Sequence, residues 1–91
     1  MTKACVQLIV SGKMQGVGFR FSTQQAANTY HIQGWVKNQP DGNVEIRAQG
    51  EQAQLSQFID WAKHGPQFAN VHDVAITQLV TQNELTQFSI R

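Results

Sequence analysis

The stretch QGWVKNQPDGNVEIRAQ, residues 33–49, decides the fold because it holds two strand patterns joined by a turn. At its centre, residues 40–43 are Pro-Asp-Gly-Asn, the residue types that favour a tight turn. After the turn, apolar residues alternate with polar ones, as in a strand with one buried face. These apolar residues are Val44, Ile46 and Ala48. Because Trp35 and Val36 begin a second strand before the turn, we predict a β-hairpin over 33–49.

Helical patterns flank the hairpin on both sides. Before it, Ser22 is followed three residues later by Gln25, which is the spacing of a capping box and predicts a helix over about 22–31. After it, apolar residues at helical spacing predict a helix over 51–64 that ends at Gly65-Pro66. The expected buried positions are Thr23, Ala26, Ala27 and Tyr30 in the first helix and Leu55, Phe58, Ile59 and Ala62 in the second.

Strand patterns at the two ends of the chain complete the fold. Residues 4–11 and about 71–80 are rich in alternating apolar residues, and 88–90 form a short last strand. The order strand, helix, two strands, helix, strand predicts an α+β ferredoxin-like sandwich, in which an antiparallel sheet carries both helices on one face. At 91 residues the chain is expected to be a single domain, 1–91.

The composition excludes several classes of protein. With 41% hydrophobic and 14% charged residues, the chain is globular and not disordered. The net charge is +1 without a basic cluster, so we expect the chain to bind neither nucleic acid nor membranes. We also expect a monomer. No apolar run approaches the roughly 18 residues that span a bilayer, and Gln7 interrupts the first strand too early for a signal peptide. The single Cys5, expected to be buried, excludes an internal disulfide and fits a reducing cytoplasm.

A glycine-rich loop, GKMQGVG at residues 12–18, connects the first strand to the first helix. Backbone N–H groups of such a loop converge near the positive end of the helix dipole and suit a phosphate-sized anion. Arg20 adds a charged, fork-shaped donor for two phosphoryl oxygens. The loop is neither a Walker loop, since Val17-Gly18 follows Gly16, nor a dinucleotide fingerprint, since position 21 is Phe. From these residues alone, a purely structural turn is an equally good interpretation.

The segments GKMQGVGFR at 12–20 and GWVKN at 34–38 closely resemble the acylphosphatase family. The resemblance covers nearly the whole chain. The further matching positions are Asp41, Gly42, Val44, Glu45, Gly50, Gly65, Pro66, Phe88 and Ile90. Met14 stands where the family usually has Val, and Lys37 where Arg is common. Neither change removes a group that the mechanism needs, because Met14 would contribute only its backbone.

The resemblance implies a hydrolase that converts an acyl phosphate, a small-molecule partner, into a carboxylate and inorganic phosphate without metal or other cofactor. It implies that Arg20 binds the phosphoryl oxygens together with loop amides, and that Asn38 positions the attacking water. The residues expected to bind the phosphate are Met14, Gln15, Gly16, Val17, Gly18, Phe19 and Arg20. Without the resemblance, Asn38 is better interpreted as a turn residue, because the Pro-Asp-Gly turn follows closely.

The stretch between Gly12 and Asn38 lacks Asp, Glu and Cys, and its one His is His31. A carboxylate with a pKa of about 4 to 5 can leave without a general acid. We therefore hypothesise that no protein base takes part and that a phosphate oxygen of the substrate accepts the proton of the water. None of the three histidines has metal-ligand spacing with another His or Cys.

Aromatic residues flank the arginine of the loop. Phe19 and Phe21 are expected to pack the helix start into the core and so to hold Arg20 in place. Trp35 and Trp61 are interpreted as core or half-buried packing residues, although Trp35 could also shape the rim of the site.

Two other functions are compatible with the predicted fold. The first is an RNA-recognition module, but the expected outward positions lack the aromatic side chains that stack on bases. These positions are Gln7, Ile9, Glu45 and Arg47. The second is a catalytically silent phosphate-sensing domain, which the sequence does not exclude. The presence of both Arg20 and Asn38 favours the enzyme.

Overall fold

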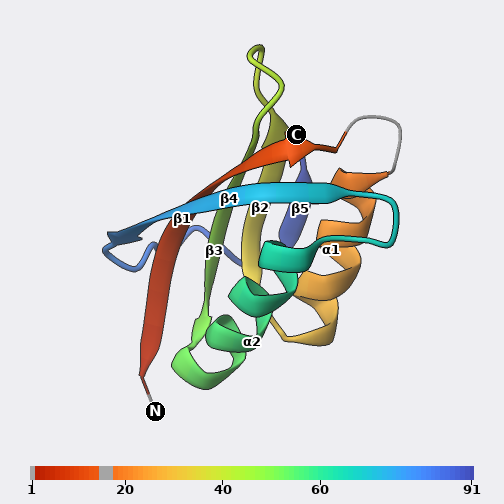
Figure 1. Cartoon of the computed structure of the whole chain (residues 1–91). Coiled ribbons are helices and arrows are strands. Elements are labelled where there is room, and N and C mark those ends of the chain that lie inside the picture. Colours follow the sequence, from red (N-terminus) through yellow and green to blue (C-terminus); the bar gives the residue numbers. More distant parts are fainter. Residues whose placement is uncertain (1, 15–17) are drawn as a thin grey trace.

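The structure of the protein is a computed structural model that describes residues 2–14 and 18–91. Within these residues two helices pack against a five-stranded sheet (Figure 1). The strands are β1 (Lys3–Lys13), β2 (Gln33–Asn38), β3 (Val44–Glu51), β4 (Asn70–Leu79) and β5 (Phe88–Ile90), and the helices are α1 (Phe19–Thr29) and α2 (Gln52–His64). Both helices cover the same face of the sheet, which confirms the predicted ferredoxin-like sandwich (Figure 1).

The strand order of the sheet is β4-β1-β3-β2-β5. β1 pairs antiparallel with β3 and β4, and β2 pairs antiparallel with β3, but β5 pairs in parallel with β2. The antiparallel arrangement predicted for the first four strands is confirmed, and the short fifth strand, for which no orientation was predicted, makes the sheet mixed. The chain leaves β4 at one edge of the sheet and reaches the opposite edge through residues 80–87, so β5 enters beside β2 in the same direction (Figure 1). This pairing brings the last strand close to α1.

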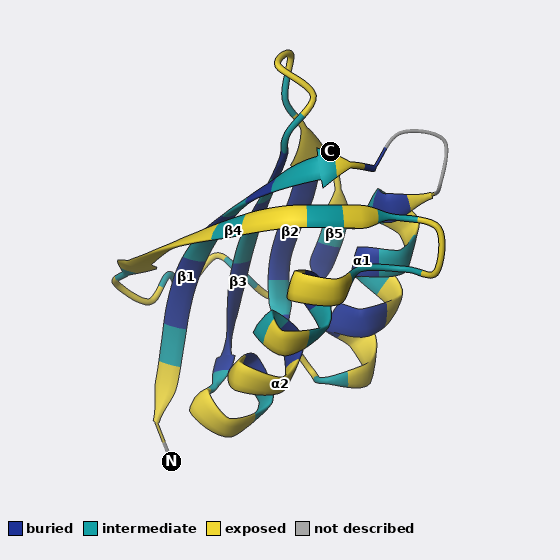
Figure 2. Ribbon diagram, viewed as in Figure 1, coloured by how far each residue is buried: buried dark blue, intermediate teal, exposed yellow. Residues whose placement is uncertain are grey.

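The core lies between the sheet and the two helices (Figure 2). Alternate positions of the central strands are buried, as their period of two predicts. They include Val6, Leu8 and Val10 on β1 and Val44, Ile46 and Ala48 on β3. The helices contribute Thr23, Ala26, Ala27, Leu55, Phe58 and Ala62. Because burial of each large apolar side chain stabilises by about 1.5–3 kcal/mol, this core fixes the elements that end at the site.

Helix α1 begins one turn earlier than predicted. Its N-cap is Gly18, with φ 67° and ψ 37°, and no side chain caps the first turn. Ser22 lies inside the helix, where its N–H donates to the carbonyl of Gly18 (2.9 Å). The predicted capping box is therefore wrong. A glycine in the left-handed conformation starts the helix, since a residue with a Cβ would be strained there.

The hairpin and α2 confirm the predicted turn and helix stop. The N–H of Gln39 donates to the carbonyl of Asn43 (2.8 Å), and the N–H of Asn43 donates to Oδ1 of Asp41 (2.9 Å), which closes the loop between β2 and β3. Helix α2 ends at Gly65, whose N–H donates to the carbonyl of Trp61 (2.8 Å). Strand β4 ends at Leu79, before the predicted limit of 80.

The face of the sheet opposite the helices is covered by residues 80–87. There the N–H of Gln82 donates to Oε1 of Gln49 (2.7 Å), and Nε2 of Gln49 donates back to the carbonyl of Gln82 (3.0 Å). Cys5 pairs with Gln49 across β1 and β3 and is fully buried, as predicted. No helix among the described residues is long and apolar enough to cross a membrane.

Trp35 also lies on this face, because it pairs with Arg47 between β2 and β3. The expectation that the outward positions lack an aromatic residue is therefore wrong. The ring is nevertheless only 7% exposed, since the guanidinium of Arg91 lies 4.7 Å and that of Arg47 5.1 Å from its centroid. A ring covered in this way offers no platform for stacking a nucleic-acid base.

Candidate active site

A cavity of about 430 Å³ lies where the start of α1, the end of β2 and the last strand meet. Its lining brings Arg20 and Asn38 together, although these residues come from different elements. The lining residues are Met14, Gly18, Phe19, Arg20, Phe21, Asn38, Gln39, Gly42, Val44 and Ile90. β3 lies between β1 and β2, so the strands on either side of α1 are one strand apart. The cavity is thus formed at one end of the sheet by segments distant in sequence.

Arg20 lies in the first turn of α1, and its guanidinium is held by the residue that follows β5, the edge strand beside α1. One of its guanidinium nitrogens, Nη1, donates to the carbonyl oxygen of Arg91 (3.1 Å). The N–H of Arg91 donates in turn to the carbonyl of Val36 (2.8 Å), which continues the pairing of β5 with β2. A guanidinium has five N–H donors, so this bond leaves most of the fork available for an anion.

Asn38 is the last residue of β2 and is exposed. Its backbone is fixed because it pairs with Val44 of β3 and because Gln39 begins the hydrogen-bonded turn. Among the described residues, no hydrogen bond of the Asn38 side chain was found. The amide can therefore both donate to and accept from a molecule in the cavity, such as water.

Residues at both described ends of the glycine-rich loop line the cavity. Met14 lines it on one side, and Gly18 and Phe19 line it on the other. The predicted contributions of Gln15, Gly16 and Val17 lie outside the described residues. The positive φ of Gly18 confirms that this loop uses a conformation that favours glycine.

The two phenylalanines beside Arg20 behave differently. Phe19 is buried at 3% exposure and packs against Trp61 (5.9 Å between ring centroids), as predicted. Phe21 is 60% exposed, so the prediction that it packs into the core is wrong. Residues two positions apart in a helix do not share a face, and both lie in the helix because α1 begins at Phe19. Burial of one phenylalanine therefore exposes the other.

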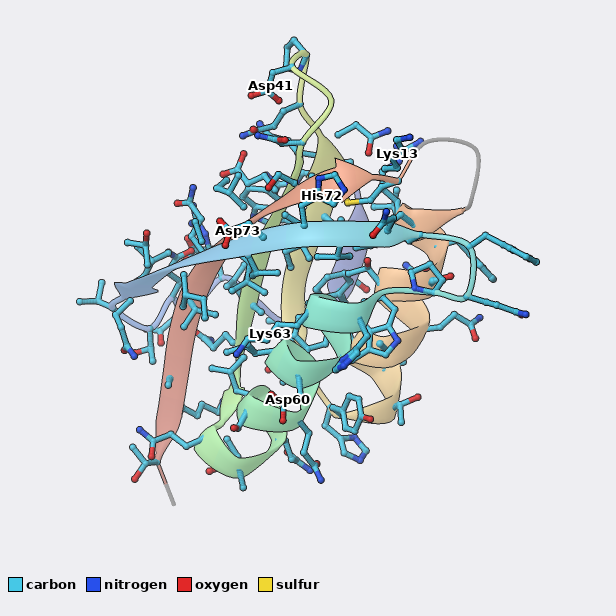
Figure 3. The ribbon with its side chains drawn as sticks, in the orientation of Figure 1. Lys13, Asp41, Asp60, Lys63, His72 and Asp73 are labelled. Carbon is cyan, nitrogen blue, oxygen red and sulfur yellow. The ribbon has the colours of Figure 1, made fainter. Side chains whose placement is uncertain are left out.

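The described lining of the cavity contains one charged side chain, Arg20, and no Asp, Glu, His or Cys. Figure 3 shows Asp41 at the tip of the hairpin, Asp60 on α2 and Asp73 on β4, and none of the three lines the cavity. No group of three or more His, Cys, Asp or Glu within residues 2–14 and 18–91 is placed to hold a metal ion. The charge of the cavity is therefore positive in its described part, which suits an anionic ligand.

Glu45 is hydrogen-bonded to one of the residues that line the cavity. Nε2 of Gln39, a lining residue, donates to Oε1 of Glu45 (3.2 Å), and the same oxygen is 3.8 Å from Nζ of Lys37. The carboxylate is thus engaged by two donors. Glu45 itself does not line the cavity, so it is a poor candidate for a proton acceptor there.

Sequence reasoning missed part of this lining. Phe21, Gln39, Gly42, Val44 and Ile90 were not among the predicted site residues. Ile90 reaches the cavity only because β5 pairs in parallel with β2, and a three-residue strand carries no sequence signal for its partner. Gly42 belongs to the predicted turn at residues 40–43, but the position of this turn relative to Arg20 depends on the whole sheet.

The fold and the site define a small α+β protein with a positively charged cavity between a helix start and the end of a sheet. The family model described as acylphosphatase matches residues 6–90, so the chain belongs to the acylphosphatase family. The acylphosphatase of Oceanobacillus iheyensis is 44% identical over 87 residues, which cover 94% of this chain and 96% of that protein. That of Marinobacter nauticus is 48% identical over 81 residues, covering 89% and 88% of the two chains.

A solved structure supports the same assignment. The crystal structure of acylphosphatase from Bacillus subtilis superimposes with a TM-score of 0.92 at 39% identity, over 97% of this chain and 98% of that one. The resemblance inferred from the loop and from the GWVKN segment is therefore confirmed, as is the fold. The family consists of hydrolases, and this chain is an enzyme of that class.

Proposed function

We propose that the chain hydrolyses the carboxyl-phosphate bond of acyl phosphates, without a metal ion, in the cavity lined by Arg20 and Asn38. In this reaction RCO–OPO₃²⁻ and water give RCOO⁻ and H₂PO₄⁻. The oxygen of water bonds to phosphorus, and the bond from phosphorus to the bridging oxygen breaks. The carboxylate leaves with that electron pair. The observation that carries the proposal is that Arg20 and Asn38 line one cavity, together with both described ends of the glycine-rich loop.

Arg20 and the loop amides are proposed to bind the phosphoryl group. Phosphoryl transfer requires alignment and stabilisation of charge on the equatorial oxygens, and a guanidinium with preorganised N–H groups supplies both. The bond from Arg20 to the carbonyl of Arg91 supports this role, because it restrains the guanidinium before an anion binds. Met14, Gly18 and Phe19 line the cavity, which supports a contribution from their backbone amides. Gln15, Gly16 and Val17 complete the proposed set.

Asn38 is proposed to position the attacking water. Its amide carries both a donor and an acceptor, so it can orient a water by two hydrogen bonds without taking its proton. The proton passes to a phosphoryl oxygen of the substrate, which balances the equation above. No Asp, Glu, His or Cys lines the described part of the cavity, and this supports a mechanism in which the substrate serves as its own base.

The direct test of the activity is release of phosphate from benzoyl phosphate in the presence of a chelator such as EDTA. We expect turnover well above the uncatalysed rate, unchanged by the chelator, and competitive inhibition by inorganic phosphate. A matched preparation of Arg20→Gln reports any contaminating phosphatase. Absence of turnover by the wild-type chain contradicts the proposal, and loss of turnover on chelation contradicts its metal-free part.

The chain is further proposed to act as one domain, 1–91, and as a cytoplasmic monomer. One continuous core supports the single domain, and a buried, unpaired Cys5 is compatible with a reducing compartment. Light scattering on the same preparation checks the monomer, for which a mass of 10.2 kDa is expected. A mass twice as large contradicts it, and recovery of the protein outside the cytoplasm contradicts the location.

A further inference from the structure

Phe21 is an exposed aromatic side chain at the cavity that holds Arg20. It is 60% exposed, although full burial of a phenylalanine is favourable by about 1.5–3 kcal/mol. It follows Arg20 directly in the first turn of α1 and lines the same cavity. A ring in this position remains available to a ligand whose phosphoryl group is bound by Arg20.

Ile90 provides a second exposed apolar surface in the same cavity. It is 39% exposed and belongs to β5, next to Arg91, whose carbonyl accepts the bond from Arg20. Three other large apolar side chains are exposed in the described structure, and none of them lines the cavity. These are Phe68, Ile76 and Val80. Of the five exposed large apolar side chains in the described structure, Phe21 and Ile90 are therefore the two that line the cavity of Arg20.

The charges around the cavity restrict what this surface can bind. Arg20 is the one charged side chain in the described lining, and in the proposed reaction it is occupied by the phosphoryl group. The carboxylate of Glu45 is already engaged by Lys37 and Gln39. No charged side chain of the described lining remains to pair with an ammonium or a carboxylate on the acyl group. A charged acyl group would lose hydration there without compensation.

We infer that Phe21 and Ile90 form the acyl subsite of the enzyme, and that this subsite selects acyl phosphates with an uncharged, apolar and preferably aromatic acyl group. The inference rests on the proposed function, since it requires that a phosphoryl group occupies Arg20. Stacking or edge contact with Phe21 favours a phenyl ring over a methyl group, and Ile90 supplies further apolar contact. A difference of one phenyl group in a partly open apolar site is expected to change kcat/KM by about tenfold.

The experiment compares kcat/KM for benzoyl phosphate, acetyl phosphate and succinyl phosphate, which carry a phenyl, a methyl and a carboxylate-bearing acyl group. For the wild type we expect benzoyl phosphate to be preferred over acetyl phosphate by about tenfold, and succinyl phosphate to be the poorest of the three. In Phe21→Gln the ratio of benzoyl to acetyl phosphate should fall at least about fivefold, and Phe21→Leu should restore part of it. Ile90→Thr should lower the ratio to a smaller extent.

The matched control is Phe68→Gln, which removes another exposed phenylalanine (79% exposed) outside the cavity and should leave the ratio unchanged. Thermal unfolding of each variant checks that the compared chains are folded. An unchanged ratio in both Phe21→Gln and Phe21→Leu, with all substrates still hydrolysed, overturns the acyl subsite alone. Failure of the wild-type chain to hydrolyse any of the three substrates overturns the proposed function and the subsite with it.

Discussion

Arg20 and Asn38 face one cavity but are held in different ways. The side chain of Arg20 is restrained, because its guanidinium donates to the carbonyl of Arg91, the residue that follows β5. For Asn38 the backbone is restrained by pairing with Val44, whereas its exposed side chain has no hydrogen bond to another described residue. A preorganised cation suits an anion that must be bound each turnover, and an unengaged amide suits a small neutral molecule such as water.

The different restraints on Arg20 and Asn38 suggest different roles, binding of the phosphoryl group by Arg20 and positioning of the water by Asn38. If the two residues divide the work as proposed, removing Arg20 affects the affinity for phosphate and the rate, whereas removing Asn38 affects mainly the rate. Loss of an interaction that is made only in the transition state lowers kcat without weakening binding in the ground state. The two substitutions are therefore expected to leave different kinetic signatures although both residues line the same cavity.

The largest effect is expected for Arg20→Gln. Loss of the guanidinium removes the one charged group in the described lining, so kcat/KM for benzoyl phosphate should fall by about 10³-fold or more, and phosphate should bind weakly. Steady-state kinetics and calorimetric titration with phosphate measure both quantities. Lys63→Gln on α2 is the control for loss of a positive charge, because Lys63 is exposed and outside the cavity. Retained phosphate affinity in Arg20→Gln contradicts the assignment.

The second effect is expected for Asn38→Ala. Removal of one positioned polar group should lower kcat by about 10²-fold, while the dissociation constant of phosphate changes by less than about threefold. The same kinetics and titration apply. Asn28→Ala is the matched control, because Asn28 is an exposed asparagine of α1 that does not line the cavity. Equal losses of phosphate affinity in Asn38→Ala and Arg20→Gln would show that the two residues do not divide the work.

The smallest expected effect is on the pH dependence of stability. It comes from Cys5, which lies on the face of the sheet opposite the helices. Burial raises the pKa of the Cys5 thiol, and Glu84 adds to this rise while Arg47 opposes it. Because the folded pKa is above the unfolded one, the contribution of Cys5 to stability is complete below the unfolded thiol pKa of about 8.5. It is lost as the pH rises through the folded pKa.

Urea unfolding of the wild type and of Cys5→Ala, at pH about 7 and about 10, checks this direction. The free energy of unfolding should fall more steeply with pH in the wild type than in the variant. Parallel pH dependence of the unfolding free energy in the two chains contradicts the role of Cys5.

The pH dependence of kcat tests the absence of a protein base. Over the neutral range, kcat of the folded enzyme should show no dependence on a titrating side chain, since none of the Asp, Glu, His and Cys residues lines the described cavity. A sigmoid kcat profile near neutrality contradicts this expectation.

Much of the fold followed from local patterns in the sequence. The Pro-Asp-Gly-Asn turn and the alternation of Val44, Ile46 and Ala48 were sufficient for the hairpin, because turn chemistry and a period of two act within a few residues. Helix α2 was predicted almost to the residue, since Gly65 and Pro66 mark its end. These features do not depend on distant parts of the chain.

The features that could not be predicted from the sequence depend on backbone conformation or on contacts between distant residues. The start of α1 is set by the left-handed Gly18, which leaves no side-chain signature, and this start determines that Phe21 is exposed. The parallel pairing of β5 depends on the path of residues 80–87 across the sheet. The candidate site was named from the family resemblance, but its apolar rim of Phe21 and Ile90 was not, because Ile90 enters only with that pairing.

The most direct test of the central claim is a crystal structure with bound phosphate or sulfate. The account predicts an anion in the cavity, with its oxygens within about 3 Å of the guanidinium of Arg20 and of loop amides, and with the Asn38 side chain facing the phosphorus or sulfur atom. Arg20 should keep its bond to the carbonyl of Arg91. An anion bound elsewhere, or one in the cavity with Asn38 turned away from it, would contradict the account.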